Sequence, residues 1–175
     1  VIDNRFISER VNQIRNWNME FIHGDILDKE LVNKHFKDAD IVHHLAGITQ
    51  VPRTKSESTS NQDEKIKLVG EKGTQNILDS ISDKCKIIFP STHVVYEGIE
   101  KVKNDIKEDE ETKPVLSYSS SKAINEKQLK ESGKNYVILR LGSVYGYSTD
   151  TTRIDIMPNL FSKIASQNGT LKLFS

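Results

Sequence analysis

Residues 86–96 read KIIFPSTHVVY, a short β-branched run that ends in two hydroxyl side chains. A near-continuous apolar run of this length is typical of a strand that is covered on both faces of a sheet. Three further runs have the same character: MEFIH at 19–23, DIVHHLA at 40–46 and YVILRL at 136–141. The chain also opens on apolar residues that resemble the end of such a strand. The sequence therefore predicts several short, buried strands.

Helical patterns lie between these runs. Apolar residues recur at helical spacing over three ranges, 7–14, 29–36 and 64–81. A fourth helix is expected from Ser117 to Gly133, because glycine commonly ends a helix. Strands that alternate with helices favour right-handed β–α–β units. We therefore predict one α/β domain over residues 1–175, with a doubly wound parallel sheet in a three-layer α/β/α arrangement.

The composition argues against a highly charged partner. Lysine and arginine together number 25, as do aspartate and glutamate, so the formal net charge is zero. A neutral chain offers no general attraction to nucleic acid or to an anionic membrane. The sequence contains no apolar run long enough for a membrane span, and Cys85 is its one cysteine, which suits a reducing compartment. We expect a cytoplasmic protein that binds neither nucleic acid nor membrane.

Residues 117–123, SYSSSKA, place Tyr118 and Lys122 one helical turn apart. If Ser117 caps the helix, both side chains project from one face near its N-terminus. An ammonium group and a helix N-terminus both stabilise a phenolate, which can take the proton of an alcohol while hydride leaves the carbon. The alternative is a surface tyrosine at a helix start, and the spacing alone does not decide between the two.

Further hydroxyl side chains are expected at the carboxyl ends of two strands, where parallel sheets bind their ligands. Thr92 follows the run at 86–90 and could share a substrate oxygen with Tyr118. His93 either faces a substrate or forms a hydrogen bond at the strand end. In the loop at 142–152, Ser143 and Tyr145 either line a pocket or pack within the loop.

Three motifs in a fixed order identify a resemblance. They are Ser91-Thr92-His93-Val94-Val95-Tyr96, then Tyr118-Ser119-Ser120-Ser121-Lys122, then Leu139-Arg140-Leu141-Gly142-Ser143-Val144-Tyr145-Gly146. In order and spacing the chain resembles the extended short-chain dehydrogenases/reductases of the NAD-dependent epimerase/dehydratase family, and especially their nucleotide-sugar epimerases. The resemblance implies a Rossmann-like fold, NAD as cofactor and a nucleotide-sugar substrate. It assigns catalysis to Thr92, Tyr118 and Lys122.

The resemblance also implies which residues contact NAD and the substrate. Asp3 matches the acidic residue that takes the ribose hydroxyls, and Asp25 and Ile26 match the pair beside the adenine. Taken alone, Asp3 would be a turn carboxylate. The implied cofactor contacts are Asp3, Asn4, Asp25, Ile26, Leu45, Ala46, Gly47, Thr49, Tyr118, Lys122 and Gly142. The implied substrate contacts are Thr92, His93, Ser143 and Tyr145.

Several departures from the family pattern stand out. The glycine-rich phosphate loop and most of the substrate lobe have no counterpart here, so we expect a piece of a longer protein that by itself binds NAD poorly. Gly70 stands where the family usually has an asparagine, which leaves a water-mediated proton path below Lys122 in doubt. His93 and Val94 replace the acidic pair of the dehydratases, which argues against 4,6-dehydration.

The expected activity is therefore that of a UDP-glucose 4-epimerase-like enzyme. Two alternatives are a sugar oxidoreductase of the same family with net redox chemistry, and a non-catalytic NAD-sensing binding protein. By analogy with relatives, a homodimer is expected through the helices at 64–81 and 117–132. No metal site is expected, because the adjacent His43 and His44 point to opposite faces of a strand. Arg140 lies between two leucines, which favours a buried ion pair.

Overall fold

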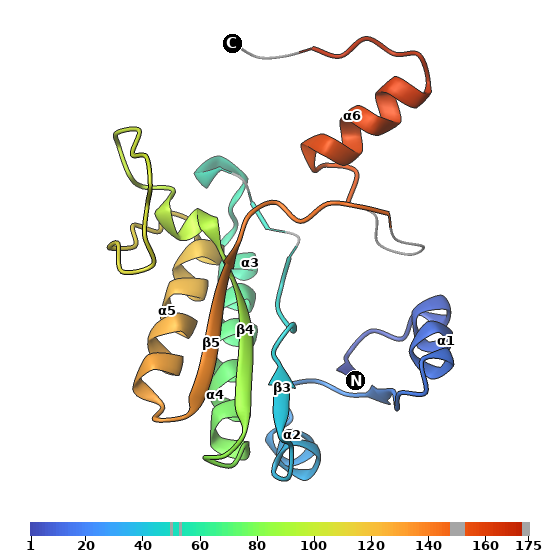
Figure 1. The fold of residues 1–175 in the computed structure, drawn as a ribbon, viewed down its shortest axis with the longest axis vertical. Helices are drawn as coiled ribbons and strands as arrows, with labels where there is room; N and C mark the ends of the chain where they lie inside the picture. The colour runs from blue at the N-terminus through green and yellow to red at the C-terminus, as the bar shows by residue number, and fades with distance from the viewer. Residues whose placement is uncertain (50, 53, 148–152, 173–175) are drawn as a thin grey trace. The chain divides into compact units, whose positions relative to one another are not determined.

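A computed structural model describes residues 1–49, 51–52, 54–147 and 153–172 (Figure 1). The chain divides into two compact units. The larger unit contains Ile2–Asn4 and Ile22–Leu141, and the smaller contains Val1, Arg5–Phe21 and the residues from Gly142 onward. Each unit is considered by itself below.

The strands of the larger unit are all parallel. Strand β1 (Ile2–Asp3) pairs with β2 (Ile22–His23), and β4 (Lys86–Thr92) lies between β3 (Ile41–His43) and β5 (Asn135–Leu141). The predicted parallel α/β class is therefore confirmed. Strands β2 and β3 are shorter than the runs that predicted them, whereas β4 extends through its two terminal hydroxyl residues.

The described residues of this unit form the helices α2 (Lys29–Phe36), α3 (Ser60–Lys67), α4 (Gly73–Ser80) and α5 (Ser117–Glu131). Helix α2 has the predicted bounds, and the Asp28 carboxylate caps it by accepting a hydrogen bond from the Leu31 amide. Beyond α5, Gly133 has a φ of 69°, the left-handed conformation expected of a helix stop. Short 3₁₀ turns, η1 (Lys55–Glu57) and η3 (His93–Tyr96), complete the unit.

The helix predicted at 64–81 differs from the expectation. It begins earlier, at Ser60, and a π-helical segment, η2 (Leu68–Lys72), separates α3 from α4. A π turn widens the helix and leaves carbonyl groups without their usual partners. Two amide side chains of α5 supply those partners, since Asn125 donates to the Gly70 carbonyl at 3.1 Å and Gln128 to the Glu71 carbonyl at 3.1 Å.

The hydrophobic core lies between the sheet and the helices. Its central side chains are Ile26, Val32, Val42, Ile77, Leu78, Ile81, Cys85, Ile87, Phe89 and Leu129. Cys85, the single cysteine, is fully buried within this core. On β5, however, Val137, Leu139 and Leu141 remain 38%, 43% and 38% exposed. The prediction that this strand is buried on both faces is wrong, because alternate side chains point away from the helix-covered face.

The smaller unit is built around α1 (Ser8–Asn16) and α6 (Met157–Ser166). Val11 and Ile14 of α1 are buried, and the rings of Phe6 and Phe21 meet edge to face at 5.8 Å. Near α6, the Asn159 side chain accepts a hydrogen bond from the Gly146 amide and donates to the Arg153 carbonyl.

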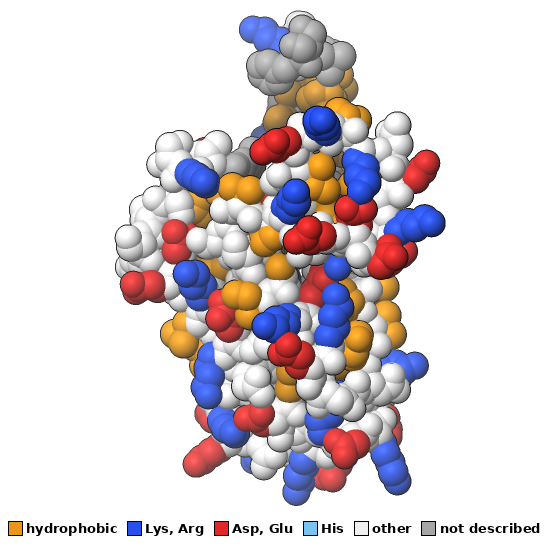
Figure 2. All heavy atoms as spheres, turned by 90° about the vertical axis from the view of Figure 1, so that its left-hand side faces the viewer, with side chains coloured by type: hydrophobic (Ala, Val, Ile, Leu, Met, Phe, Trp, Pro, Cys, Tyr) orange, Lys and Arg blue, Asp and Glu red, His pale blue; other side chains and the backbone are white. Residues whose placement is uncertain are grey.

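Two surface properties complete the description. On the face shown in Figure 2, acidic and basic side chains alternate with hydrophobic ones, in line with the zero net charge. Within the described ranges, no helix combines the length and apolar character that a membrane crossing requires.

Candidate active site

Lys122 joins helix α5 to the end of β4. Its ammonium donates to the Pro90 carbonyl at 2.9 Å and lies 4.4 Å from the centre of the Phe89 ring. The same nitrogen is 6.0 Å from the centre of the Tyr118 ring, one helical turn earlier. Since Pro90 stands two residues before Thr92, these contacts bring the predicted tyrosine–lysine pair to the carboxyl end of β4.

The Lys122 ammonium lies in a poorly solvated place. Burial lowers its pKa from 10.5 to about 8, although the negative charge of Glu126 works in the opposite direction. At neutral pH the side chain therefore still carries its positive charge, but only by a small margin. Such a cation attracts a developing negative charge more strongly than a solvated one does.

Ser91 and Thr92 serve different purposes although they are neighbours, because successive side chains of a strand point to opposite faces. The Ser91 hydroxyl donates to the Glu126 carboxylate at 2.6 Å. Thr92 is 8% exposed, and its hydroxyl oxygen accepts a hydrogen bond from the Val94 amide at 3.3 Å. A hydroxyl group has one hydrogen to donate, and that of Thr92 has no acceptor among the described residues.

Glu97 holds the beginning of α5 in place. Its carboxylate accepts hydrogen bonds from the Val115 and Leu116 amides, each at 2.7 Å, and from the Ser119 hydroxyl. These groups immediately surround Tyr118 in the chain. Glu97 therefore connects the turn after Thr92 to the first turn of the helix that carries Tyr118. The sequence carries no signal for this contact, since its partners lie 18 to 22 residues away.

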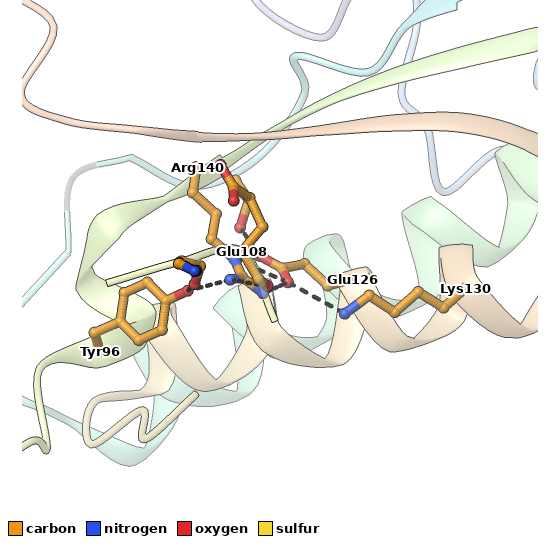
Figure 3. A network of polar contacts seen from close by, with 7 residues as sticks. Tyr96, Glu108, Glu126, Lys130 and Arg140 are labelled. Carbon is orange, nitrogen blue, oxygen red and sulfur yellow. Dashed lines mark hydrogen bonds and ion pairs between the residues drawn. The ribbon is translucent and has the colours of Figure 1, made fainter. Parts of the chain in front are cut away.

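Arg140, near the end of β5, forms an ion pair with Glu126 on α5 (Figure 3). The guanidinium donates to both carboxylate oxygens, at 2.6 Å from Nη2 to Oε2 and 3.0 Å from Nε to Oε1, and the side chains are only 14% and 3% exposed. Arg140 also donates to the Tyr96 hydroxyl and to the Glu108 carbonyl. The predicted buried ion pair of Arg140 is confirmed, whereas its partner was not identified from the sequence.

Glu126 remains charged despite its burial. Burial by itself raises the pKa of this carboxyl group, but hydrogen bonds from Arg140 and Ser91 outweigh that effect and leave the pKa below its ordinary value. Lys130 adds a weaker attraction, with its amine 3.9 Å from the carboxylate. A fixed negative charge therefore lies one helical turn beyond Lys122.

His44 follows β3 directly and is 2% exposed. Its Nε2 is 2.9 Å from the Thr74 hydroxyl, and its ring centre is 5.4 Å from that of Phe89. Burial, and to a smaller extent the charge of Lys122, lowers its pKa to about 3. The imidazole is therefore neutral at physiological pH, and its buried Nδ1 has no hydrogen-bond partner among the described residues.

The first predicted group of cofactor residues gathers at the carboxyl ends of β1 and β2. The Asn4 amide donates to one Asp25 oxygen at 3.0 Å, and the Leu27 amide donates to the other at 2.9 Å. Asp3 is half-buried at the end of β1, next to Asn4. Ile26 differs, because its side chain is 7% exposed and belongs to the core. A Cβ atom on Gly73 would lie 2.2 Å from it, so only glycine permits this packing.

The second predicted group follows β3. Leu45 is 72% exposed, Thr49 is exposed, and Ala46 packs partly against the core. Apart from its chain neighbours, no described residue has a heavy atom within 4 Å of the position that a Cβ on Gly47 would take, so the backbone is open to them on that side. Carboxylates near β1 and β2, an open glycine after β3 and an ammonium on α5 are groups that match ribose hydroxyls and a dinucleotide lying across strand ends. The residues present therefore fit NAD.

The predicted substrate residues have varied surroundings. His93 is exposed, and its Nδ1 is 3.1 Å from the Leu141 carbonyl, as the hydrogen-bonded alternative expected. Gly142, Ser143 and Tyr145 belong to the smaller unit and are exposed. Residues 148–152 of the same loop lie outside the described residues. The assignment of these residues to substrate or cofactor stays a prediction.

Gly70 occupies the place where the family usually has an asparagine, and the structure gives a steric reason for glycine there. A Cβ atom at this position would lie 2.2 Å from the Ser121 hydroxyl oxygen. In its present position the Ser121 hydroxyl on α5 therefore occupies the space that a side chain at residue 70 would need. The Asn125 amide, from α5, is the polar group that reaches this point instead.

Comparison with known proteins agrees with the fold and with the motifs. The model of the NAD dependent epimerase/dehydratase family matches residues 1–175. A UDP-glucose 4-epimerase of Azospirillum brasilense is 32% identical over 135 residues, which are 71% of this chain and 36% of that protein. A 3β-hydroxysteroid-dehydrogenase/decarboxylase of Arabidopsis thaliana is 26% identical over 147 residues, 76% of this chain and 24% of that protein.

Among solved structures, a UDP-glucuronic acid 4-epimerase of Bacillus cereus, in complex with UDP-glucuronic acid and NAD, has the same fold. The TM-score is 0.74 at 24% identity, over 99% of this chain and 56% of that one. Fold and strand-end residues define a Rossmann-like α/β protein of the dinucleotide-binding class. The chain belongs to the NAD-dependent epimerase/dehydratase family, and it spans between about a quarter and a little over half of these relatives' lengths.

Proposed function

We propose that this chain is the NAD-binding part of a nucleotide-sugar epimerase that resembles UDP-glucose 4-epimerase. The observation that supports the proposal is the hydrogen bond from Lys122 on α5 to the carbonyl of Pro90, which stands two residues before Thr92 on β4. The match to a UDP-glucose 4-epimerase over 71% of the chain supports the substrate class.

The cofactor would be held by residues of the larger unit. Asp3 and Asn4 would accept and donate hydrogen bonds at the adenosine ribose, and Asp25 would line the adenine site beside them. The turn from Leu45 to Gly47 would pass beneath the dinucleotide, where the bare glycine lets the backbone come close. NAD, when bound, supplies the acceptor and donor of hydride.

The proton chemistry belongs to Tyr118, Lys122 and Thr92. Tyr118 would take the proton of a sugar hydroxyl while hydride leaves the same carbon for NAD, so that a keto sugar forms. It would return the proton to the oxygen when hydride is delivered to the other face of that carbon. Lys122 stabilises the phenolate by its charge and uses one of its three N–H donors on Pro90, so the others remain for a ribose hydroxyl. Thr92 donates to the substrate oxygen and stabilises the charge that develops on it.

The test is a stereochemical assay with UDP-glucose in the protein that carries this chain. We expect UDP-galactose to form without net accumulation of NADH, and we expect Tyr118→Phe to abolish turnover while NAD still binds. Thr92→Val should reduce turnover by about 10- to 1000-fold, as removal of an oxyanion donor does. Unchanged turnover in Tyr118→Phe would refute the proposed mechanism.

A net oxidoreductase is the second candidate, supported by the similarity to a 3β-hydroxysteroid-dehydrogenase/decarboxylase over 76% of the chain. The same three residues would serve it, since proton removal from an alcohol is common to both reactions. Stoichiometric NADH formation from an alcohol substrate would favour this candidate over the epimerase. NAD binding without turnover of any substrate, and without an effect of Tyr118→Phe, would instead indicate an NAD-sensing protein.

We also propose a cytoplasmic homodimer, assembled through α5 and the helices α3 and α4. Leu68, on the π segment between α3 and α4, and Ile124, on α5, are 54% and 39% exposed and would be covered by the second copy. Light scattering of the protein should give the mass of a dimer, and Ile124→Asp should lower it to that of a monomer. A monomer in the unmodified protein would contradict this part of the proposal.

A further inference from the structure

Two consecutive residues of β4 contact two residues of α5 that lie one turn apart. The Pro90 carbonyl accepts from Lys122 at 2.9 Å, and the Ser91 hydroxyl donates to Glu126 at 2.6 Å. Residues i and i+4 share one face of a helix, so both contacts come from the same side of α5. The position of Lys122 along the strand is therefore tied to that of Glu126.

Glu126 is itself held by a third element. Arg140 lies opposite Ser91 in the pairing of β4 with β5, and its guanidinium donates to both oxygens of the carboxylate (Figure 3). A bidentate contact of this kind fixes the orientation of a carboxylate more firmly than a single hydrogen bond does. With 3% of the side chain exposed, water hardly screens this charge.

Among the described residues, the polar and titratable groups that face Lys122 form a small set. Glu126 and Tyr118 lie on its own helix, and His44, the residue after β3, faces it as a neutral imidazole. From β4 it meets the uncharged Pro90 carbonyl and the Phe89 ring. Arg140 on β5 and Lys130 on α5 bind Glu126 rather than Lys122. Glu126 is thus the carboxylate that opposes the ammonium.

We propose that Glu126, held by Arg140 and Ser91, is a positioning residue for the tyrosine–lysine pair: it fixes Lys122 against the end of β4 and supplies the negative charge that faces its ammonium. The inference rests on the proposed function only where it gives the pair a catalytic role. A purely structural ion pair would hold the sheet to the helix and would leave the protonation of Lys122 unaffected.

The experiment measures the protonation of Lys122 directly. In protein labelled with ¹³C at the lysine side chains, the Lys122 signal is assigned by its loss in Lys122→Arg and followed by NMR against pH. Glu126→Gln keeps the shape and the acceptor oxygen of the side chain but removes its charge. We expect the titration midpoint of Lys122, about 8 in the unmodified protein, to shift to lower pH in this variant.

Glu131→Gln is the matched control, because it makes the same change on the same helix at a side chain that is 67% exposed and pairs with Lys127. It should leave the Lys122 midpoint in place. Glu126→Asp, which keeps the charge but withdraws it by one methylene group, should shift the midpoint less than Glu126→Gln does. If Glu126→Gln does not fold, the shift in Glu126→Asp decides the question.

An unchanged Lys122 midpoint in folded Glu126→Gln, or in Glu126→Asp where the first variant is unfolded, would overturn the inference. An equal shift in Glu131→Gln would overturn it as well. The measurement involves no turnover and is therefore independent of the proposed function. A shifted midpoint in a protein without epimerase or dehydrogenase activity would uphold the inference and refute the proposed function.

Discussion

Replacement of Lys122 by methionine should change how the stability of the chain depends on pH. The folded state lowers the pKa of this side chain from 10.5 to about 8, chiefly by burial. Between these two values the unfolded chain binds a proton that the folded chain does not, so the free energy of unfolding rises with pH. The contribution of Lys122 to stability is therefore fully present above pH 10.5 and is lost as the pH falls through 8.

The size of the effect follows from the two pKa values. Each pKa unit corresponds to about 1.4 kcal/mol, so the difference amounts to about 3 kcal/mol. Urea unfolding, followed by circular dichroism at pH 7, 8, 9 and 10, measures it. The unmodified chain should gain about 1.4 kcal/mol per pH unit relative to Lys122→Met between pH 8 and 10. As the pH falls below 8 the difference between the two proteins should level off, because Lys122 is then increasingly protonated in the folded as well as the unfolded chain.

A second substitution on the same helix serves as the control. Lys127 is 72% exposed, so Lys127→Met should leave the pH dependence of the unfolding free energy unchanged. Parallel stability profiles for the unmodified chain and Lys122→Met between pH 8 and 10 would refute the reasoning, since they would mean that Lys122 has an ordinary pKa in the folded state.

Three further predictions concern stability. Gly70→Ala should destabilise the chain by about 1–3 kcal/mol, and adding Ser121→Ala should recover most of the loss, because the new Cβ would otherwise lie 2.2 Å from the serine oxygen; urea unfolding that shows no recovery would contradict this. Arg140→Met should cost about 3–5 kcal/mol by leaving the Glu126 carboxylate buried without its partner, whereas Arg140→Met with Glu126→Met should cost much less; equal losses in the single and double variants would count against it. His44→Asn should remove part of the acid sensitivity of the chain. Because folding lowers the pKa of His44 from 6.5 to about 3, this side chain lowers the unfolding free energy by about 1.4 kcal/mol per pH unit as the pH falls between these values. An unchanged slope of the unfolding free energy against pH in the variant would disprove this prediction.

The secondary structure was predictable where the apolar pattern is strong and local. Helix α2 has the predicted bounds, and Gly133 stands after α5 in the expected left-handed conformation. The π segment at 68–72 was not predictable in the same way. It is stabilised by the side chains of Asn125 and Gln128, which lie more than fifty residues away in the chain. A helical periodicity records which face is apolar, not where another helix supplies hydrogen bonds.

The candidate site likewise contains residues that the sequence predicted and residues that it did not. Tyr118 and Lys122 were found from their spacing, and Arg140 from its leucine neighbours. Glu97 and Glu126 were missed, because a glutamate that accepts hydrogen bonds across the fold has the same appearance in the sequence as one on the surface. Burial of β5 was overestimated for a related reason, since an apolar run does not state which faces other elements cover.

The amino-acid sequence by itself determined the alternation of strands and helices, the parallel class of the sheet and the one-turn spacing of Tyr118 and Lys122. These features depend on periodicity and chain connection, which act over a few residues. The tertiary structure alone decided the low pKa of Lys122, the carboxylate that opposes it and the need for glycine at residue 70. Desolvation and close packing depend on which distant segments surround a side chain, and only the folded chain brings those segments together.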